Sequence, residues 1–95
     1  MLKSSKFLTL AQKVVNMKIY DYNGSKNICG KRVKEARRRL KLSQENLAAR
    51  LQVEGVNIER DSVSRIEIGT RFVADYELLA LSKILGVTPA YLLGE

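Results

Sequence analysis

The chain has 95 residues, of which 45% are hydrophobic and 28% charged, and its formal net charge is +7 at pH 7. This length suits one small domain, and the ordinary hydrophobic fraction excludes a chain that is disordered throughout. There is no histidine and a single cysteine, Cys29, so an internal disulfide and a Cys/His zinc site are both excluded and the inventory for catalysis is poor.

Residues 1–29 are predicted to be an N-terminal extension and linker, partly flexible or helical. Residues 1–19 contain an approximate helical stripe of apolar side chains, namely Phe7, Leu10, Ala11, Val14 and Val15. Their apolar run is shorter than the roughly 18 residues of a membrane span. It is also not followed by a small-residue cleavage site, so we do not predict a secretory signal peptide. Because residues 20–30 are rich in turn-forming residues, we place the domain boundary there, with the working domain over residues 30–95.

Residues 31–42 are predicted to form the first core helix, because its inward and outward faces differ in character. The inward face consists of Val33, Ala36, Arg37 and Leu40, and the outward face is basic. Ser43 is a good N-cap for a second helix, and Gly55 is a suitable residue to stop it. The apolar face of this second helix consists of Leu47, Ala48 and Leu51.

The basic side of the first helix dominates the distribution of charge. Residues 1–42 carry twelve basic and two acidic residues, a net charge of +10, whereas residues 43–95 carry five and eight, a net charge of −3. This division favours a polyanionic partner that meets one face of the protein. The plainer alternative is a basic helix face that is only solvated.

The third helix is predicted over residues 60–68, with Gly69 as its end. Val63 and Ile66 point inward, with Ser62 beside them. The outer face carries Arg60, Asp61, Ser64, Arg65 and Ile68. Arginine donates two hydrogen bonds to guanine, serine serves several bases, and aspartate accepts from the N4 amino group of cytosine. Together with the second helix this is the layout of a helix-turn-helix, although an amphipathic surface helix is the alternative when the segment is taken alone.

Two short helices are predicted to close the domain. Asp75 caps the fourth and Gly86 ends it, and its apolar residues are Leu78, Leu79, Leu81, Ile84 and Leu85. The fifth helix is predicted to begin with Thr88 as its N-cap and Pro89 as its first helical residue. No alternating strand pattern occurs in the core, so the predicted fold class is all-α: a compact five-helix domain with a non-core N-terminal extension.

Three segments within residues 30–94 resemble the Cro/repressor-like helix-turn-helix proteins, the XRE family. They are SQENLAARL, DSVSRIEIG and RFVADYELLALSKILGVTPAYLLG, in the family's order. The resemblance implies the lambda-repressor-like fold and a sequence-specific transcriptional regulator, cytoplasmic and nucleoid-associated in a bacterial or phage-like setting. It also implies a homodimer on a palindromic operator of double-stranded DNA, with no cofactor, no metal and no catalytic residue.

Roles for individual residues follow from this resemblance and from the helix faces. The predicted base-reading residues are Glu59, Arg60, Asp61, Ser64 and Arg65. The predicted phosphate contacts are Arg38, Ser43, Gln44, Thr70 and Arg71. The resemblance implies a partly buried salt bridge between Arg37 and Glu67. The predicted dimer surface consists of Val87, Thr88, Tyr91 and Leu92, with closure of the core as the alternative for the last two.

The connection QVEGVNIE is longer than in compact members of the family. We therefore expect the second helix to run one extra turn, to residues 52–54, with Val56 and Ile58 as core anchors. Glu59 occupies a position where Ser or Thr usually caps the helix. Asp61 is an alternative cap, and if it caps the helix it cannot also read a base.

A second function class stays open at this stage. A protein-interaction module, such as an antitoxin or an adaptor, would use the same fold to hold a protein partner through residues 1–19. An enzyme is not expected, because the chain contains no nucleophile–base pair, no metal cluster and no glycine-rich phosphate loop.

Overall fold

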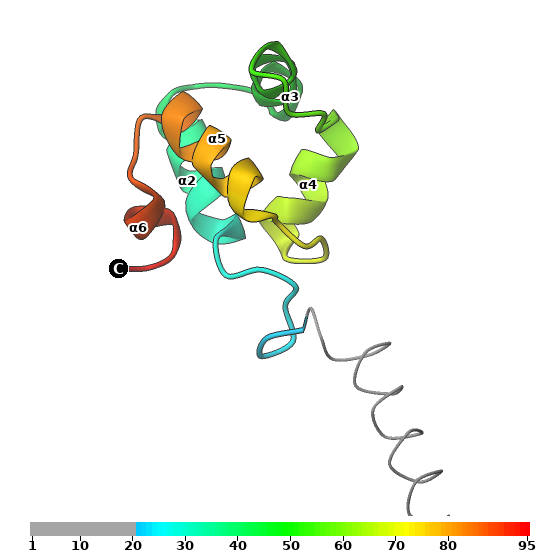
Figure 1. Cartoon of the computed structure of the whole chain (residues 1–95), viewed down its shortest axis with the longest axis vertical. Helices are drawn as coiled ribbons and strands as arrows, with labels where there is room; N and C mark the ends of the chain where they lie inside the picture. Colours follow the sequence, from blue (N-terminus) through cyan, green and yellow to red (C-terminus); the bar gives the residue numbers. More distant parts are fainter. Residues whose placement is uncertain (1–20) are drawn as a thin grey trace, which may run out of the picture.

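The computed structural model describes residues 21–95, which form five α-helices and no β-sheet (Figure 1). The helices are α2 (Gly30–Arg39), α3 (Gln44–Val53), α4 (Arg60–Ile68), α5 (Asp75–Leu85) and α6 (Pro89–Leu92). None of them is long and apolar enough to cross a membrane. The all-α prediction is confirmed for this part of the chain, and the predictions for residues 1–19 lie outside it.

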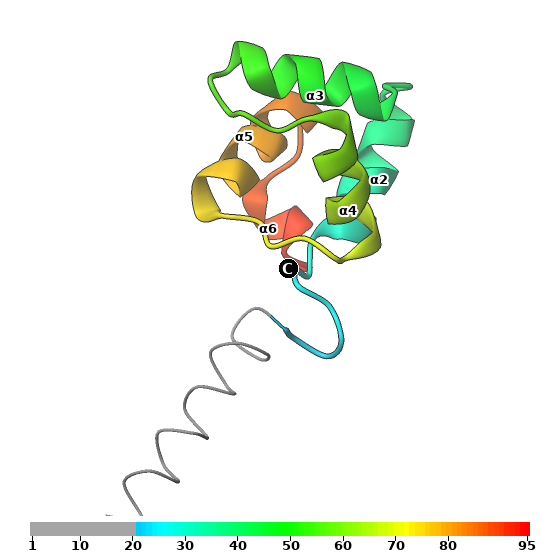
Figure 2. The same ribbon diagram turned by 90° about the vertical axis from the view of Figure 1, so that its right-hand side faces the viewer.

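The five helices enclose one core (Figures 1 and 2). α2 contacts α4, α5 and α6, while α3 lies across one end of the domain and contacts α4 and α5. The largest fully buried side chains are Val33, Leu47, Leu51, Ile58, Val63, Ile66, Leu81 and Leu92. Every helix contributes at least one side chain to this set. Burial of their apolar surface therefore holds α3 and α4 against the remaining helices.

Local sequence signals set most helix ends as predicted. Ser43 Oγ accepts a hydrogen bond from the Asn46 N–H (3.0 Å), which starts α3. Thr88 Oγ1 accepts a hydrogen bond from the Tyr91 N–H at 2.9 Å, which starts α6. Gly69, with φ +85°, ends α4, whose bounds are those predicted. α3 ends at Val53, within the range expected for its extra turn.

The end of α2 differs from the prediction. The helix ends at Arg39, and Leu40, which was expected to face the core, is 46% exposed. Lys41 then adopts a left-handed conformation (φ +58°), which reverses the chain. Leu42, which follows this turn, is 9% exposed, so it is buried where Leu40 is not.

The start of α5 also differs. Ala74, not Asp75, is the N-cap residue, and the Glu77 carboxylate accepts a hydrogen bond from the Ala74 N–H at 2.9 Å. An acidic residue three positions into a helix satisfies such an unpaired donor. Leu79, predicted to be part of the apolar face, is 47% exposed. The buried positions of α5 are Glu77, Ala80, Leu81, Ser82 and Leu85.

Residues 21–29 lead from a tight turn into α2, and one of them joins two helix ends. Asn27 Nδ2 donates to the carbonyl oxygens of Ile66 (3.1 Å) and Arg71 (2.8 Å), at the end of α4 and just beyond it. Asn27 Oδ1 accepts from the Gly30 N–H (2.8 Å) at the start of α2. These bonds satisfy backbone groups that helix ends leave without partners.

Candidate nucleic-acid interface

α4 has one buried face and one solvent-facing face, as the sequence predicted. Val63 and Ile66 are each 1% exposed and belong to the core, whereas Ile68 is 67% exposed. α4 contacts both α2 and α3 through the buried face. The outer face is therefore displayed on a helix whose orientation is fixed by packing on two neighbours.

The outer face of α4 brings the predicted base-reading residues together. Glu59, Arg60, Asp61 and Arg65 are exposed and Ser64 is half-buried. Glu59 is the N-cap residue but makes no side-chain cap. Asp61 lies in the first turn of α4, and its Oδ1 is 2.9 Å from Nη2 of Arg60. The carboxylate of Asp61 thus stays on the outer face, where the positive end of the helix dipole favours it.

A buried ion pair joins α2 to α4. Arg37 Nε lies 2.6 Å from Glu67 Oε2, and its Nη2 donates to Glu67 Oε1 at 3.0 Å. The side chains are 10% and 1% exposed, and Nη1 of Arg37 also donates to the Leu42 carbonyl at 2.8 Å. The hydrogen bonds to Glu67 raise the pKa of Arg37 above its ordinary value. This two-pronged bond fixes the angle between the two helices.

Gln44, the first residue of α3, belongs to the same network. Its Nε2 donates to Glu67 Oε1 at 3.0 Å, and the residue is half-buried. The sequence predicted Gln44 as a phosphate contact but gave no sign of this bond. An amide nitrogen has two N–H donors, so one remains for a phosphate while the other is held by the carboxylate.

The long connection between α3 and α4 is anchored at both ends. Ile58 is 1% exposed and Val56 is half-buried against the core, as predicted. Gln52 Nε2 donates to the Ile58 carbonyl at 3.1 Å, which ties the connection back to α3. Gly55, with φ +85°, turns the chain after α3. The extra residues of the connection therefore lie between the end of α3 and the start of α4, and α4 still packs against the core.

Arg71 has a partner that the sequence analysis missed. Its Nη1 and Nη2 donate to the two carboxylate oxygens of Glu77 at 3.0 and 3.1 Å, and Nη1 also donates to the Phe72 carbonyl. Burial alone would raise the pKa of Glu77, but these bonds and the Ala74 N–H lower it. The guanidinium therefore pins the segment after α4 to α5, and Thr70 beside it is exposed.

The predicted dimer surface needs one correction. Leu92 is fully buried and belongs to the core, because α6 packs its single apolar ridge against α2 and α5. Val87 and Tyr91 are half-buried and Thr88 is exposed as the cap of α6. The Arg39 guanidinium lies 6.0 Å from the centre of the Tyr91 ring.

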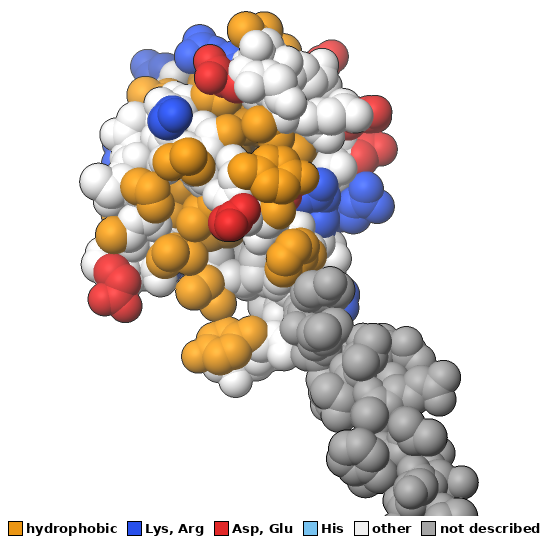
Figure 3. Space-filling view, viewed as in Figure 1, with side chains coloured by type: hydrophobic (Ala, Val, Ile, Leu, Met, Phe, Trp, Pro, Cys, Tyr) orange, Lys and Arg blue, Asp and Glu red, His pale blue; other side chains and the backbone are white. Residues whose placement is uncertain are grey.

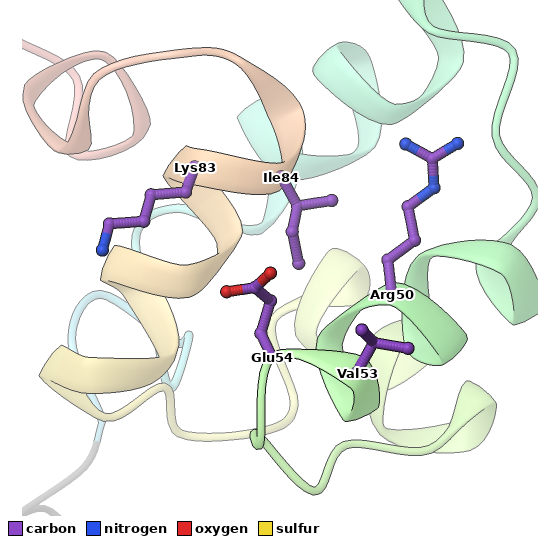
Figure 4. Close-up of a pocket in the computed structure, with 5 residues that line it drawn as sticks. All are labelled: Arg50, Val53, Glu54, Lys83 and Ile84. Atoms are coloured by element: carbon purple, nitrogen blue, oxygen red, sulfur yellow. The ribbon is translucent and has the colours of Figure 1, made fainter.

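Other features of residues 21–95 offer little reactive chemistry. A groove of about 480 Å³ between α3 and α5 is lined by Arg50, Val53, Glu54, Lys83 and Ile84 (Figure 4). Cys29 is buried, and loss of solvation raises the pKa of its thiol to about 11, so it stays protonated at neutral pH. The described residues contain no cluster of His, Cys, Asp and Glu that could hold a metal.

Comparisons with known proteins agree with this architecture. A family model described as a helix-turn-helix domain matches residues 29–92. The solved structure of the P22 c2 repressor protein, in complex with synthetic operator 9T in the presence of Tl+, is 32% identical with a TM-score of 0.61. That match covers 72% of this chain and 96% of the repressor chain. No curated protein sequence matches. The chain therefore belongs to the Cro/repressor-like helix-turn-helix family.

Proposed function

We propose that this protein is a transcriptional regulator that binds double-stranded DNA in a sequence-specific manner, with α4 in the major groove. The observation that carries the proposal is the outer face of α4, where Arg60, Asp61 and Arg65 are exposed together on a helix held by a buried ion pair. Base edges are read by such side chains near the start of a recognition helix. The solved relative, a repressor bound to an operator, supports the same use.

Phosphate contacts would supply most of the affinity and fix the register of α4 on the duplex. We assign them to Arg38, Ser43 and Thr70, which are exposed, and to Gln44, which is half-buried. Arg71 contributes its charge to this surface, while its hydrogen bonds go to Glu77.

Replacing Arg65 is expected to change specificity rather than folding. Arg65→Ala should flatten the base preference at one or two positions by about 1–3 kcal/mol, because a guanidinium that donates two hydrogen bonds to one base is lost. The measurement is selection from a random duplex library with each variant. Arg50→Ala, which removes an exposed charge from α3, is the control and should keep the consensus. An unchanged consensus for Arg65→Ala would contradict the assignment of α4 as the recognition helix.

We also propose that two copies bind a palindromic operator as a homodimer. Figure 3 shows apolar side chains gathered on one face of the domain. Ile28, Phe72 and Leu93, each between 41% and 48% exposed, line a groove of about 300 Å³. Sizing of the complex with selected DNA should give two chains per duplex, and one chain per duplex at saturation would exclude the dimer.

A further inference from the structure

The outer face of α4 carries side chains suited to G·C pairs and lacks those suited to A·T pairs. Its first two turns expose Arg60, Asp61 and Arg65, with half-buried Ser64 between them. Asparagine and glutamine, which read adenine through two hydrogen bonds, are both missing from residues 59–68. The apolar side chains of these turns, Val63 and Ile66, are buried and unavailable to a thymine methyl group. Ile68 is exposed only at the last position of the helix.

Arg60 and Asp61 form an exposed ion pair at the start of α4. Nη2 of Arg60 lies 2.9 Å from Oδ1 of Asp61, and the two side chains are 59% and 75% exposed. An ion pair this exposed contributes little to folding, so stability does not account for it. The guanidinium keeps further N–H donors, and the carboxylate keeps a second acceptor oxygen. The pair therefore presents donors and an acceptor side by side at the start of α4.

This arrangement is complementary to one kind of base pair. In the major groove a G·C pair presents two acceptors, N7 and O6 of guanine, beside the N4 donor of cytosine. Arg60 can donate to the guanine while Asp61 accepts from the cytosine. With adenine in place of the guanine, the pair would set the N6 amino group of adenine against the guanidinium and O4 of thymine against the carboxylate, so donor would meet donor and acceptor would meet acceptor. With thymine in place of the guanine, the N6 amino group of adenine could still donate to Asp61, but thymine O4 would be the only acceptor left for Arg60, so a G·C pair offers the two side chains one hydrogen bond more.

We propose that α4 selects G·C pairs, with Arg60 and Asp61 reading one pair and Arg65 reading the guanine of a nearby pair. The inference rests on the proposed function and narrows it to operators whose half-sites hold at least two G·C pairs under α4. Asp61 also repels phosphate, so it lowers affinity for every duplex while it sharpens the choice among them.

The test begins with selection of duplexes from a random library by the full chain. Each selected guanine is then replaced by 7-deazaguanine, which lacks N7, or by inosine, which keeps N7 and O6 and lacks only the minor-groove amino group. We expect 7-deazaguanine under Arg60 or Arg65 to weaken binding by about 5-fold or more, as for the loss of part of a bidentate contact. Inosine should leave the affinity unchanged.

A matched pair of variants separates base reading from charge. Asp61→Ala and Glu35→Ala each remove one exposed carboxylate, the first from α4 and the second from α2. Both should bind random duplex slightly more tightly, because each reduces repulsion from phosphate. Only Asp61→Ala should lose the preference for cytosine at its position in the selected motif.

The outcomes distinguish the inference from the function on which it rests. Invariant G·C pairs together with sensitivity to 7-deazaguanine support both. A selected motif with an A·T core, or binding that tolerates 7-deazaguanine at every guanine, overturns the inference and leaves sequence-specific binding standing. Failure to enrich any duplex overturns the proposed function, and the inference with it.

Discussion

Arg37→Ala is expected to lower the free energy of unfolding by about 3–5 kcal/mol, the cost of breaking a buried ion pair by removing one partner. The substitution leaves the Glu67 carboxylate, with its side chain only 1% exposed, as an uncompensated charge between α2 and α4. It also removes the donor that the Leu42 carbonyl uses. Because small domains have total stabilities of about 5–15 kcal/mol, urea unfolding followed by circular dichroism should show a large shift in the midpoint.

Two further variants identify the cause. Arg38→Ala removes the neighbouring, exposed charge and should change stability by about 0.5 kcal/mol or less. The double variant Arg37→Met with Glu67→Met should recover much of the loss, because apolar side chains of similar size often replace a buried ion pair at little cost. Unchanged stability of Arg37→Ala combined with weaker DNA binding would instead make Arg37 a phosphate contact.

Gly30→Ala is expected to destabilise the protein by about 1–3 kcal/mol or more, as overpacking does. A Cβ atom at Gly30 would lie 2.0 Å from the Ile66 carbonyl oxygen and 3.1 Å from that of Glu67. Both are backbone atoms of α4, so α2 and α4 would have to move apart. The separation would strain the bond between Arg37 and Glu67 as well. Thermal unfolding of the variant measures the effect.

The sign of the change in stability caused by Gly30→Ala distinguishes a close helix contact from an ordinary exposed helix position. At an exposed site inside a helix, replacing glycine by alanine stabilises by about 0.5–1 kcal/mol, because alanine loses less conformational freedom. Glu35→Ala, on the exposed side of α2, controls for changes in helix propensity and should be close to neutral. A Gly30→Ala protein as stable as the parent would contradict the close approach of the two helices.

The parts of the fold that depend on local signals were predicted well from the sequence. α4 has its predicted bounds because Val63 and Ile66 mark a helical period and Gly69 supplies the left-handed end. Ser43 and Thr88 cap the helices assigned to them, because their short side chains reach backbone N–H groups within the next turn. These features need no knowledge of distant residues.

The errors occur where distant parts of the chain decide the outcome. Helical periodicity placed Leu40 in the core, but α2 ends at Arg39, Lys41 adopts a left-handed conformation, and Leu42 is buried while Leu40 is exposed. Leu92 was assigned to a dimer surface with closure of the core as the alternative, and packing of α6 against its neighbours buries it completely, which is the alternative. Gly30 reads as a turn residue in the sequence, whereas its role is a close approach between α2 and α4.

The features of the candidate site also fall into those that local sequence predicts and those that depend on distant residues. The exposed side chains of α4 followed from helix geometry alone. The bond between Arg37 and Glu67 followed only from resemblance to a family, because thirty positions separate the two residues and composition makes Arg37 one more basic residue of α2. The bond from Gln44 to Glu67 and that from Arg71 to Glu77 were missed. For the second, the signal was present: Glu77 stands at the third position of α5, where an acidic side chain faces the preceding loop.

The central claim is that the exposed face of α4 distinguishes one duplex sequence from another. The most direct measurement is an equilibrium titration of the full chain against a selected duplex and a scrambled duplex of the same composition, at one fixed salt concentration. The selected duplex should bind about 10³-fold more tightly or better, as specific sites do. Equal affinities for the two duplexes would contradict it.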